Sequence, residues 1–111
     1  MSLYMTQFAY TPQAWAALAQ NPVDRSEGLR ALAEKAGGRF VSLHYTMGEY
    51  DGVVVLDLPD DTAVMAVMIG AIAPGHLKAT KTTRLYTPAE AMEAMRKAGS
   101  FSYQAPSAGS R

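Results

Sequence analysis

Alternating apolar and polar positions predict a strand over residues 39–47. From residue 41 to residue 47 the odd positions carry apolar or aromatic side chains, and the even positions carry polar ones. A period of two is typical of a strand that buries one face. After the turn, four apolar residues in a row occupy positions 53–56. We predict a second strand over 50–58, buried on both faces.

Two other stretches are predicted strands. Residues 3–10 are rich in aromatic and apolar side chains with a rough period of two. Residues 76–86 are mostly polar, but their threonines favour extended backbone. Lys78, Lys81 and Arg84 suit the edge of a sheet, because charge there discourages pairing with another chain.

The segment between the first two strands is predicted to be helical. Thr11-Pro12 is a helix start, because threonine can accept a bond from a free N–H group and proline loses none at the first helical position. Asn21-Pro22 interrupts the segment, with the asparagine as a second cap and Asp24 at the third helical position. Gly37-Gly38 ends it. We expect one bent helix, or a short helix followed by a longer one.

Two later helices are predicted from their first residues. An aspartate caps a helix over 61–73, which has no charged residue after Asp61. A helix that is apolar all round is buried on more than one side, by another helix or by another subunit. Thr87 and Glu90 have the spacing of a capping box, and they start a last helix that Gly99 ends.

This order of elements predicts an α+β domain of the ferredoxin-like plan, βαββαβ with an extra C-terminal helix. Right-handed crossovers place the strands in a four-stranded antiparallel sheet with helices on one face. The other face needs a cover, and pairing two such faces makes a dimeric α+β barrel. We predict a single domain over residues 1–98 and a loosely ordered tail over 99–111.

Composition narrows the function classes. The 111 residues carry ten basic and ten acidic side chains, so nothing attracts a polyanion and no nucleic-acid partner is predicted. The chain has no cysteine, and its two histidines lack metal-ligand spacing, so neither a metal site nor a cofactor is predicted. No apolar run reaches the roughly 20 residues of a membrane span, and no signal-peptide pattern is present, so we expect no membrane partner and a cytoplasmic protein.

The turn between the two central strands resembles the motif of the GYD-domain family, whose glycine, tyrosine and aspartate correspond to Gly48, Tyr50 and Asp51. The resemblance covers roughly residues 3–98. It implies a dimeric α+β barrel related to small cofactor-free oxygenases and heme-handling proteins, and it implies no particular activity. Gly52 departs from the family pattern, so we expect the next strand to start later or to bulge there. The other matching segments are 4–12, 37–47, 53–61 and 84–90.

Three residues in and beside this turn are the candidate catalytic groups: His44, Tyr50 and Asp51. At the mouth of a barrel, an aspartate can take a proton from a substrate hydroxyl and a tyrosine can stabilise the resulting oxyanion. His44 lies on the polar face of its strand. If the odd positions face the helices, His44 faces the barrel interior, where it can act as a general base or as a ligand to heme or a metal. The competing interpretation is structural, with Asp51 bonding N–H groups of the turn and His44 hydrogen-bonded at a dimer interface.

A second set of residues is predicted to bind a ligand. Tyr4, Phe8 and Trp15 can wall an apolar pocket, although aromatic side chains also fill the cores of small domains. His76 can approach a histidine of the other subunit across a barrel dimer. Arg84 can bind a carboxylate, with solvated charge on an edge strand as the alternative.

Two functions remain open from the sequence. The first is a homodimer, or a multiple of dimers, that binds a small apolar or aromatic ligand inside the barrel, with cofactor-free oxygenation or isomerisation as its chemistry. The second is a non-catalytic structural or regulatory oligomer with no internal ligand site. A cavity in which His44 and Asp51 converge favours the first function.

Overall fold

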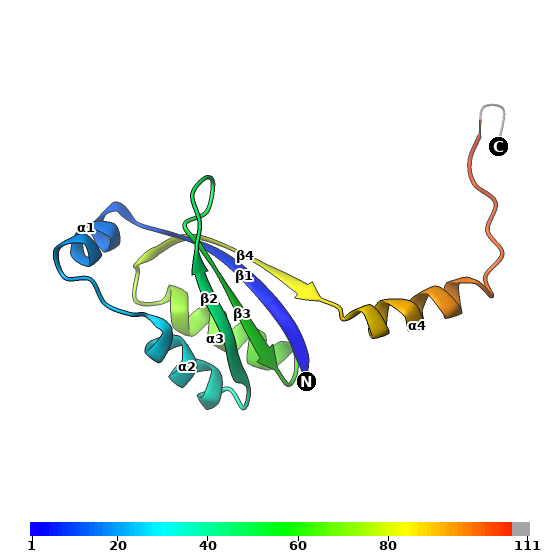
Figure 1. The fold of residues 1–111 in the computed structure, drawn as a ribbon, viewed down its shortest axis with the longest axis horizontal. Coiled ribbons are helices and arrows are strands. Elements are labelled where there is room, and N and C mark those ends of the chain that lie inside the picture. Colours follow the sequence, from blue (N-terminus) through cyan, green and yellow to red (C-terminus); the bar gives the residue numbers. More distant parts are fainter. Residues whose placement is uncertain (108–111) are drawn as a thin grey trace.

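The computed structural model describes residues 1–107, which form a four-stranded antiparallel sheet with helices on one of its faces (Figure 1). This architecture confirms the predicted ferredoxin-like plan with a further helix at the end. Within residues 1–107, no helix is both long enough and apolar enough to cross a membrane. The elements are β1 (Ser2–Tyr10), α1 (Pro12–Gln20), α2 (Ser26–Lys35), β2 (Arg39–Tyr45), β3 (Gly52–Leu58), α3 (Asp61–Ile72), β4 (Leu77–Leu85) and α4 (Pro88–Ala98).

The strand order in the sheet is β2-β3-β1-β4. β1 therefore lies in the interior of the sheet and pairs antiparallel with both β3 and β4. Its pairing with β3 runs from Ser2 opposite Leu58 to Phe8 opposite Gly52. β4 is an edge strand, as its charged residues predict.

The core lies between the sheet and the helices α2 and α3. Its largest fully buried side chains are Leu56 and Leu58 of β3 and Val67 of α3. The alternate residues of β3, such as Val53 and Val55, are only half-buried, because no helix within residues 1–107 covers that face of the sheet. The prediction that this strand is buried on both faces is therefore wrong for the single chain.

The hairpin of β2 and β3 is shorter than predicted. β2 ends at Tyr45 rather than at residue 47, and β3 begins at Gly52 rather than at residue 50. The register of β2 shifts between Phe40 and Ser42, and the residue between them, Val41, is 43% exposed. This β-bulge explains why Val41 does not face the core as its odd position predicts, because the extra residue reverses the alternation of side chains locally.

The first connection forms two separate helices, one of the two predicted alternatives. α2 does not start at the Asn21 cap, because the chain between residues 21 and 25 is not helical. Instead, the Asp24 carboxylate accepts a hydrogen bond from the backbone N–H of Ser26 at 2.9 Å. The competing Asx-type turn thus delays the second helix by a full turn.

The last two helices keep their predicted starts. Asp60 caps α3, accepting a hydrogen bond from the N–H of Ala63 at 2.8 Å. The capping box of α4 is present, with reciprocal bonds between Thr87 and Glu90 at 2.9 and 3.1 Å. α4 leaves the end of β4 and points away from the sheet (Figure 1). Residues 101–107 form neither helix nor strand. The last part of the predicted tail over 99–111, residues 108–111, lies outside the described residues.

Candidate functional site

The carboxylate of Asp51 holds the β2–β3 turn against the junction of β1 and α1. Its Oδ2 accepts hydrogen bonds from the backbone N–H of Tyr10 at 2.9 Å and from the indole Nε1 of Trp15 at 3.1 Å. The backbone N–H of Asp51 donates to the carbonyl of Phe8 at 2.7 Å. These three hydrogen bonds join segments that lie far apart in the sequence, and we call them the clamp of the GYD turn.

The three predicted catalytic residues occupy different surroundings. Tyr50 is half-buried, and its carbonyl accepts a hydrogen bond from the Thr46 hydroxyl at 2.8 Å. His44 is exposed and pairs with Val53, on the face of the sheet turned away from the helices. The structure thus brings Asp51 to Tyr10 and Trp15, and within one chain it does not bring Asp51 to His44.

Tyr10, at the end of β1, is the centre of an aromatic cluster. Its ring lies edge-on to Trp15 and Phe8, with centroids 5.1 and 5.3 Å away, and its hydroxyl lies 3.2 Å from the hydroxyl of Tyr45. Burial raises the pKa of Tyr10, and the hydrogen bond with Tyr45 raises this pKa further. The phenol therefore stays protonated at neutral pH and can donate a hydrogen bond.

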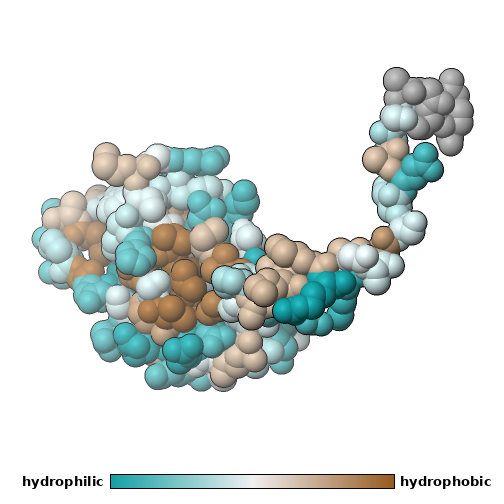
Figure 2. All heavy atoms as spheres, turned by 45° about the vertical axis from the view of Figure 1, so that its right-hand side comes forward, coloured by the Kyte–Doolittle hydropathy of each residue, from teal (hydrophilic) through white to brown (hydrophobic). Residues whose placement is uncertain are grey.

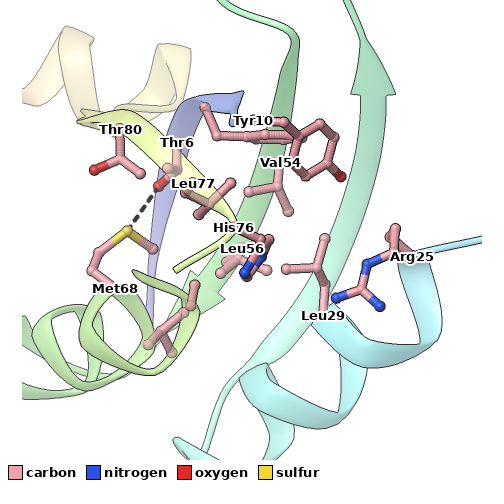
Figure 3. A pocket seen from close by; sticks show the side chains of 13 residues that line it. Thr6, Tyr10, Arg25, Leu29, Val54, Leu56, Met68, His76, Leu77 and Thr80 are labelled. Atoms are coloured by element: carbon pink, nitrogen blue, oxygen red, sulfur yellow. Dashed lines mark hydrogen bonds between the residues drawn. The ribbon is translucent and has the colours of Figure 1, made fainter. Parts of the chain in front are cut away.

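Next to this cluster, a pocket of about 50 Å³ lies between the sheet and the helices α2 and α3 (Figure 3). Its wall is almost entirely apolar, and Arg25 and His76 supply its nitrogen-bearing groups. In Figure 3, Arg25 reaches from the start of α2 toward Leu29 and His76. The lining residues are Thr6, Phe8, Tyr10, Arg25, Leu29, Val54, Leu56, Val67, Met68, Ala71, His76, Leu77 and Thr80.

Electrostatics links three side chains of this pocket. Partial burial lowers the pKa of His76, and the positive charge of Arg25 lowers this pKa further. The same guanidinium lowers the pKa of Tyr10, through its positive charge and as a hydrogen-bond partner, whereas burial raises this pKa. Among residues 1–107, Arg25 forms no ion pair with a carboxylate. At neutral pH the pocket therefore holds one cation, a neutral imidazole and a protonated phenol.

The predicted ligand-binding residues divide into two groups. Phe8 and His76 line the pocket, and Trp15 lies beside it, edge-on to Tyr10. Tyr4 and Arg84 lie elsewhere, at the base of α4. There the guanidinium of Arg84 stands 5.9 Å from the Tyr4 ring centroid and 4.4 Å from that of Tyr86.

Comparison with known proteins identifies the chain. The GYD domain family model matches residues 4–95. The chain belongs to the GYD domain family. No curated protein matches it in sequence.

Two solved structures share the fold of this GYD domain at 15% sequence identity. TTHA0845 from Thermus thermophilus aligns with a TM-score of 0.51 over 78% of this chain and 95% of its own. The 30S ribosomal protein S6 of Thermotoga maritima aligns with a TM-score of 0.53 over 88% of this chain and 97% of its own. At this identity the likeness concerns the ferredoxin-like fold alone.

Sequence reasoning missed Tyr10 and Arg25 as site residues of the GYD domain. Tyr10 has a signal in retrospect, because it is the last residue of β1, directly before the Thr11-Pro12 helix start. Arg25 has none, since it lies in the irregular segment between α1 and α2. Its place at the pocket depends on the packing of α2 against the sheet, which one sequence does not reveal.

The pocket can recognise an acid, and its residues do not form a metal centre. Among residues 1–107, no group of three or more histidine, cysteine, aspartate or glutamate side chains is placed to hold a metal ion. A guanidinium can bind a carboxylate in a bidentate manner, and a phenol O–H can add a further bond. A neutral imidazole such as that of His76 can also accept a proton from a bound acid.

Proposed function

We propose that this GYD domain binds a small organic acid in the pocket between its sheet and the helices α2 and α3. The observation that carries the proposal is the guanidinium of Arg25, which lines an apolar pocket and has no acidic partner among residues 1–107. A cation beside an apolar wall matches a ligand with an apolar body and a carboxylate head. The pocket lies on the helix side of the sheet rather than inside a barrel formed by two sheets.

The size of the pocket limits the ligand. The volume is about 50 Å³, whereas a cavity that accepts benzene measures about 150 Å³. The apolar body of the ligand is therefore short, about two carbon atoms by this comparison. Met68 borders the pocket, and its unbranched thioether can change rotamer to fit a ligand. Propionate has the right charge and size for a first probe.

The hydrogen bonds of Asp51 argue against a catalytic role for this residue of the GYD turn. A carboxylate whose Oδ2 already accepts hydrogen bonds from Tyr10 and Trp15 is a poor general base, because these bonds occupy the lone pairs of that oxygen. We therefore assign Asp51 a structural role and place ligand recognition at Arg25 and its neighbours.

The open face of the sheet supports a dimer as part of this proposal. Met5, Val53 and Val55 are half-buried there, and no helix within residues 1–107 covers them. Two copies that pair through these faces form the α+β barrel and enclose this apolar surface. His44 then lies at the interface between the sheets, and both acid-binding pockets stay outside it.

The first test is a titration with propionate, followed through backbone amide shifts in NMR spectra. We expect saturable shifts at the amides of pocket residues such as Ala71 and Thr80. Propylamine, which has a similar body and the opposite charge, should cause no saturable shift. Arg25→Gln should weaken propionate binding at least tenfold, because it removes the cation. Lys35→Gln removes one positive charge from the exposed end of the same helix and should leave binding unchanged.

A second pair of variants tests the position of the ligand. Ala71→Leu places extra carbon atoms at the pocket wall and should abolish propionate binding. Ala66→Leu makes the same change on the exposed side of α3 and should not affect it. Equal propionate affinity in the Arg25→Gln variant and the unmodified protein, or no saturable shift in the latter, would refute the proposed function.

A further inference from the structure

Helix α4 is amphipathic and stands clear of the rest of the chain (Figures 1 and 2). At 3.6 residues per turn, Ala91, Met92, Met95 and Ala98 share one face. Met92 and Met95 are 50% and 67% exposed. The Cα radius of gyration is 18.6 Å, whereas a compact domain of this length has roughly 13 Å. An apolar helix face held in water at this distance from the core needs a partner. The charged residues of the other side are Glu90, Glu93, Arg96 and Lys97.

The base of α4 is fixed by contacts that direct it outward. The guanidinium of Arg84 pairs with the carboxylate of Glu90 at 3.2 Å and stacks on the ring of Tyr86. The capping box between Thr87 and Glu90 fixes the first turn of the helix. These contacts link the end of β4 to the start of α4, so they hold the apolar face of α4 away from its own chain.

Helix α3 presents the complementary surface. Ala63 and Val67 are buried against the sheet, and the opposite side carries Met65, Ile69 and Ile72. These three side chains are 66%, 59% and 43% exposed. They follow the spacing i, i+4, i+7, which makes a continuous stripe along the helix. α3 has 12 residues and α4 has 11, so the two stripes have similar lengths.

We propose that α4 of one copy packs on α3 of a second copy, and that the second copy returns the same contact. The occupant is a second copy because each chain carries one projecting stripe and one receiving stripe. A two-fold axis then covers both stripes on both chains. The i, i+4 rows of the two helices provide the ridges and grooves through which helices pack. The contact does not depend on ligand binding at Arg25.

Disulfide trapping tests this contact directly, because the 111-residue chain has no cysteine of its own. One variant carries Ile69→Cys on α3 and the other carries Met95→Cys on α4. When the two are mixed and oxidised, we expect a disulfide-linked heterodimer on a non-reducing gel. Glu93→Cys replaces Met95→Cys in the control mixture. Glu93 lies on the charged side of α4, so this mixture should give at least tenfold less heterodimer.

Two results would overturn the proposal. The first is equal cross-linking of the Met95→Cys and Glu93→Cys variants to the Ile69→Cys variant. The second is a monomeric internal disulfide in the double variant Ile69→Cys/Met95→Cys, which would show that α4 folds back on its own α3. Residues 69, 93 and 95 are all exposed in the single chain, so the substitutions leave the core intact. None of these variants touches the propionate pocket, so this test and the propionate titration fail independently.

Discussion

Replacing Asp51 by alanine tests whether the GYD turn is a structural clamp. The change removes the acceptor of the Tyr10 backbone N–H and of the Trp15 indole N–H. Tyr10 is only 4% exposed, so its N–H group loses a partner in a place that water hardly reaches. An unsatisfied buried donor costs about 1–3 kcal/mol. The loss of the more exposed indole bond adds about 0.5–1 kcal/mol.

Together these losses predict that Asp51→Ala lowers the free energy of unfolding by about 1.5–4 kcal/mol. For a domain of this size, the melting temperature should fall by roughly 6–17 °C. Asp51→Asn keeps one acceptor oxygen and should cost about half as much. Thermal unfolding followed by circular dichroism measures both variants.

Glu49→Ala is the matched control, because Glu49 is an exposed acid in the same turn and takes no part in the clamp. Its melting temperature should stay within about 2 °C of that of the unmodified protein. An Asp51→Ala variant with the same stability as the Glu49→Ala control would refute the clamp. A stable Asp51→Asn variant that no longer binds propionate would return Asp51 to the ligand site.

Two further predictions concern a glycine and a histidine. A Cβ atom at Gly52 would lie 2.9 Å from Cε2 of Phe8 and 3.0 Å from the carbonyl oxygen of His44, so Gly52→Ala should destabilise the fold by about 1–3 kcal/mol in urea unfolding. Gly28→Ala, in α2 with its nearest atom 3.9 Å away, should instead stabilise by about 0.5–1 kcal/mol; a loss of equal size in both would contradict the steric argument. Burial and Arg25 lower the pKa of His76 in the folded protein, so at mildly acidic pH the unfolded chain binds more protons than the folded one. The contribution of His76 to stability is therefore lost as the pH falls from the ordinary histidine pKa through the lowered one. An NMR titration should find the His76 pKa below 6.5 and closer to that value in Arg25→Gln; a pKa above 6.5 would show that the imidazole is not desolvated.

The fold was predictable because its signals are local. The capping box at Thr87 and Glu90 and the aspartate before α3 depend on neighbours within one turn of helix. Errors arose where a second local preference competed. Asp24 bonded Ser26 and displaced the cap expected at Asn21, and a bulge beside Val41 reversed the alternation of β2.

The site was less predictable because its contacts cross the fold. Asp51 meets Tyr10 and Trp15 at sequence separations of 41 and 36 residues. No spacing rule links such distant positions in one sequence. The alternation of β2 did place His44 on the sheet face away from the helices, but the direction of Asp51 followed from the turn and from α1.

The central place of β1 sets the order in which the sheet can be completed during synthesis. β1 is made before both of its neighbours, β3 and β4, so one of its hydrogen-bonding edges stays open until Leu58 has been added and the other until Leu85 has been added. Contacts between such distant segments give a high contact order, and high contact order slows folding. An apolar strand that waits with an open edge is prone to pair with other nascent chains. Early steps of folding in this domain therefore fall to the β2–β3 hairpin and the helices beside it, and the capture of β1 comes late.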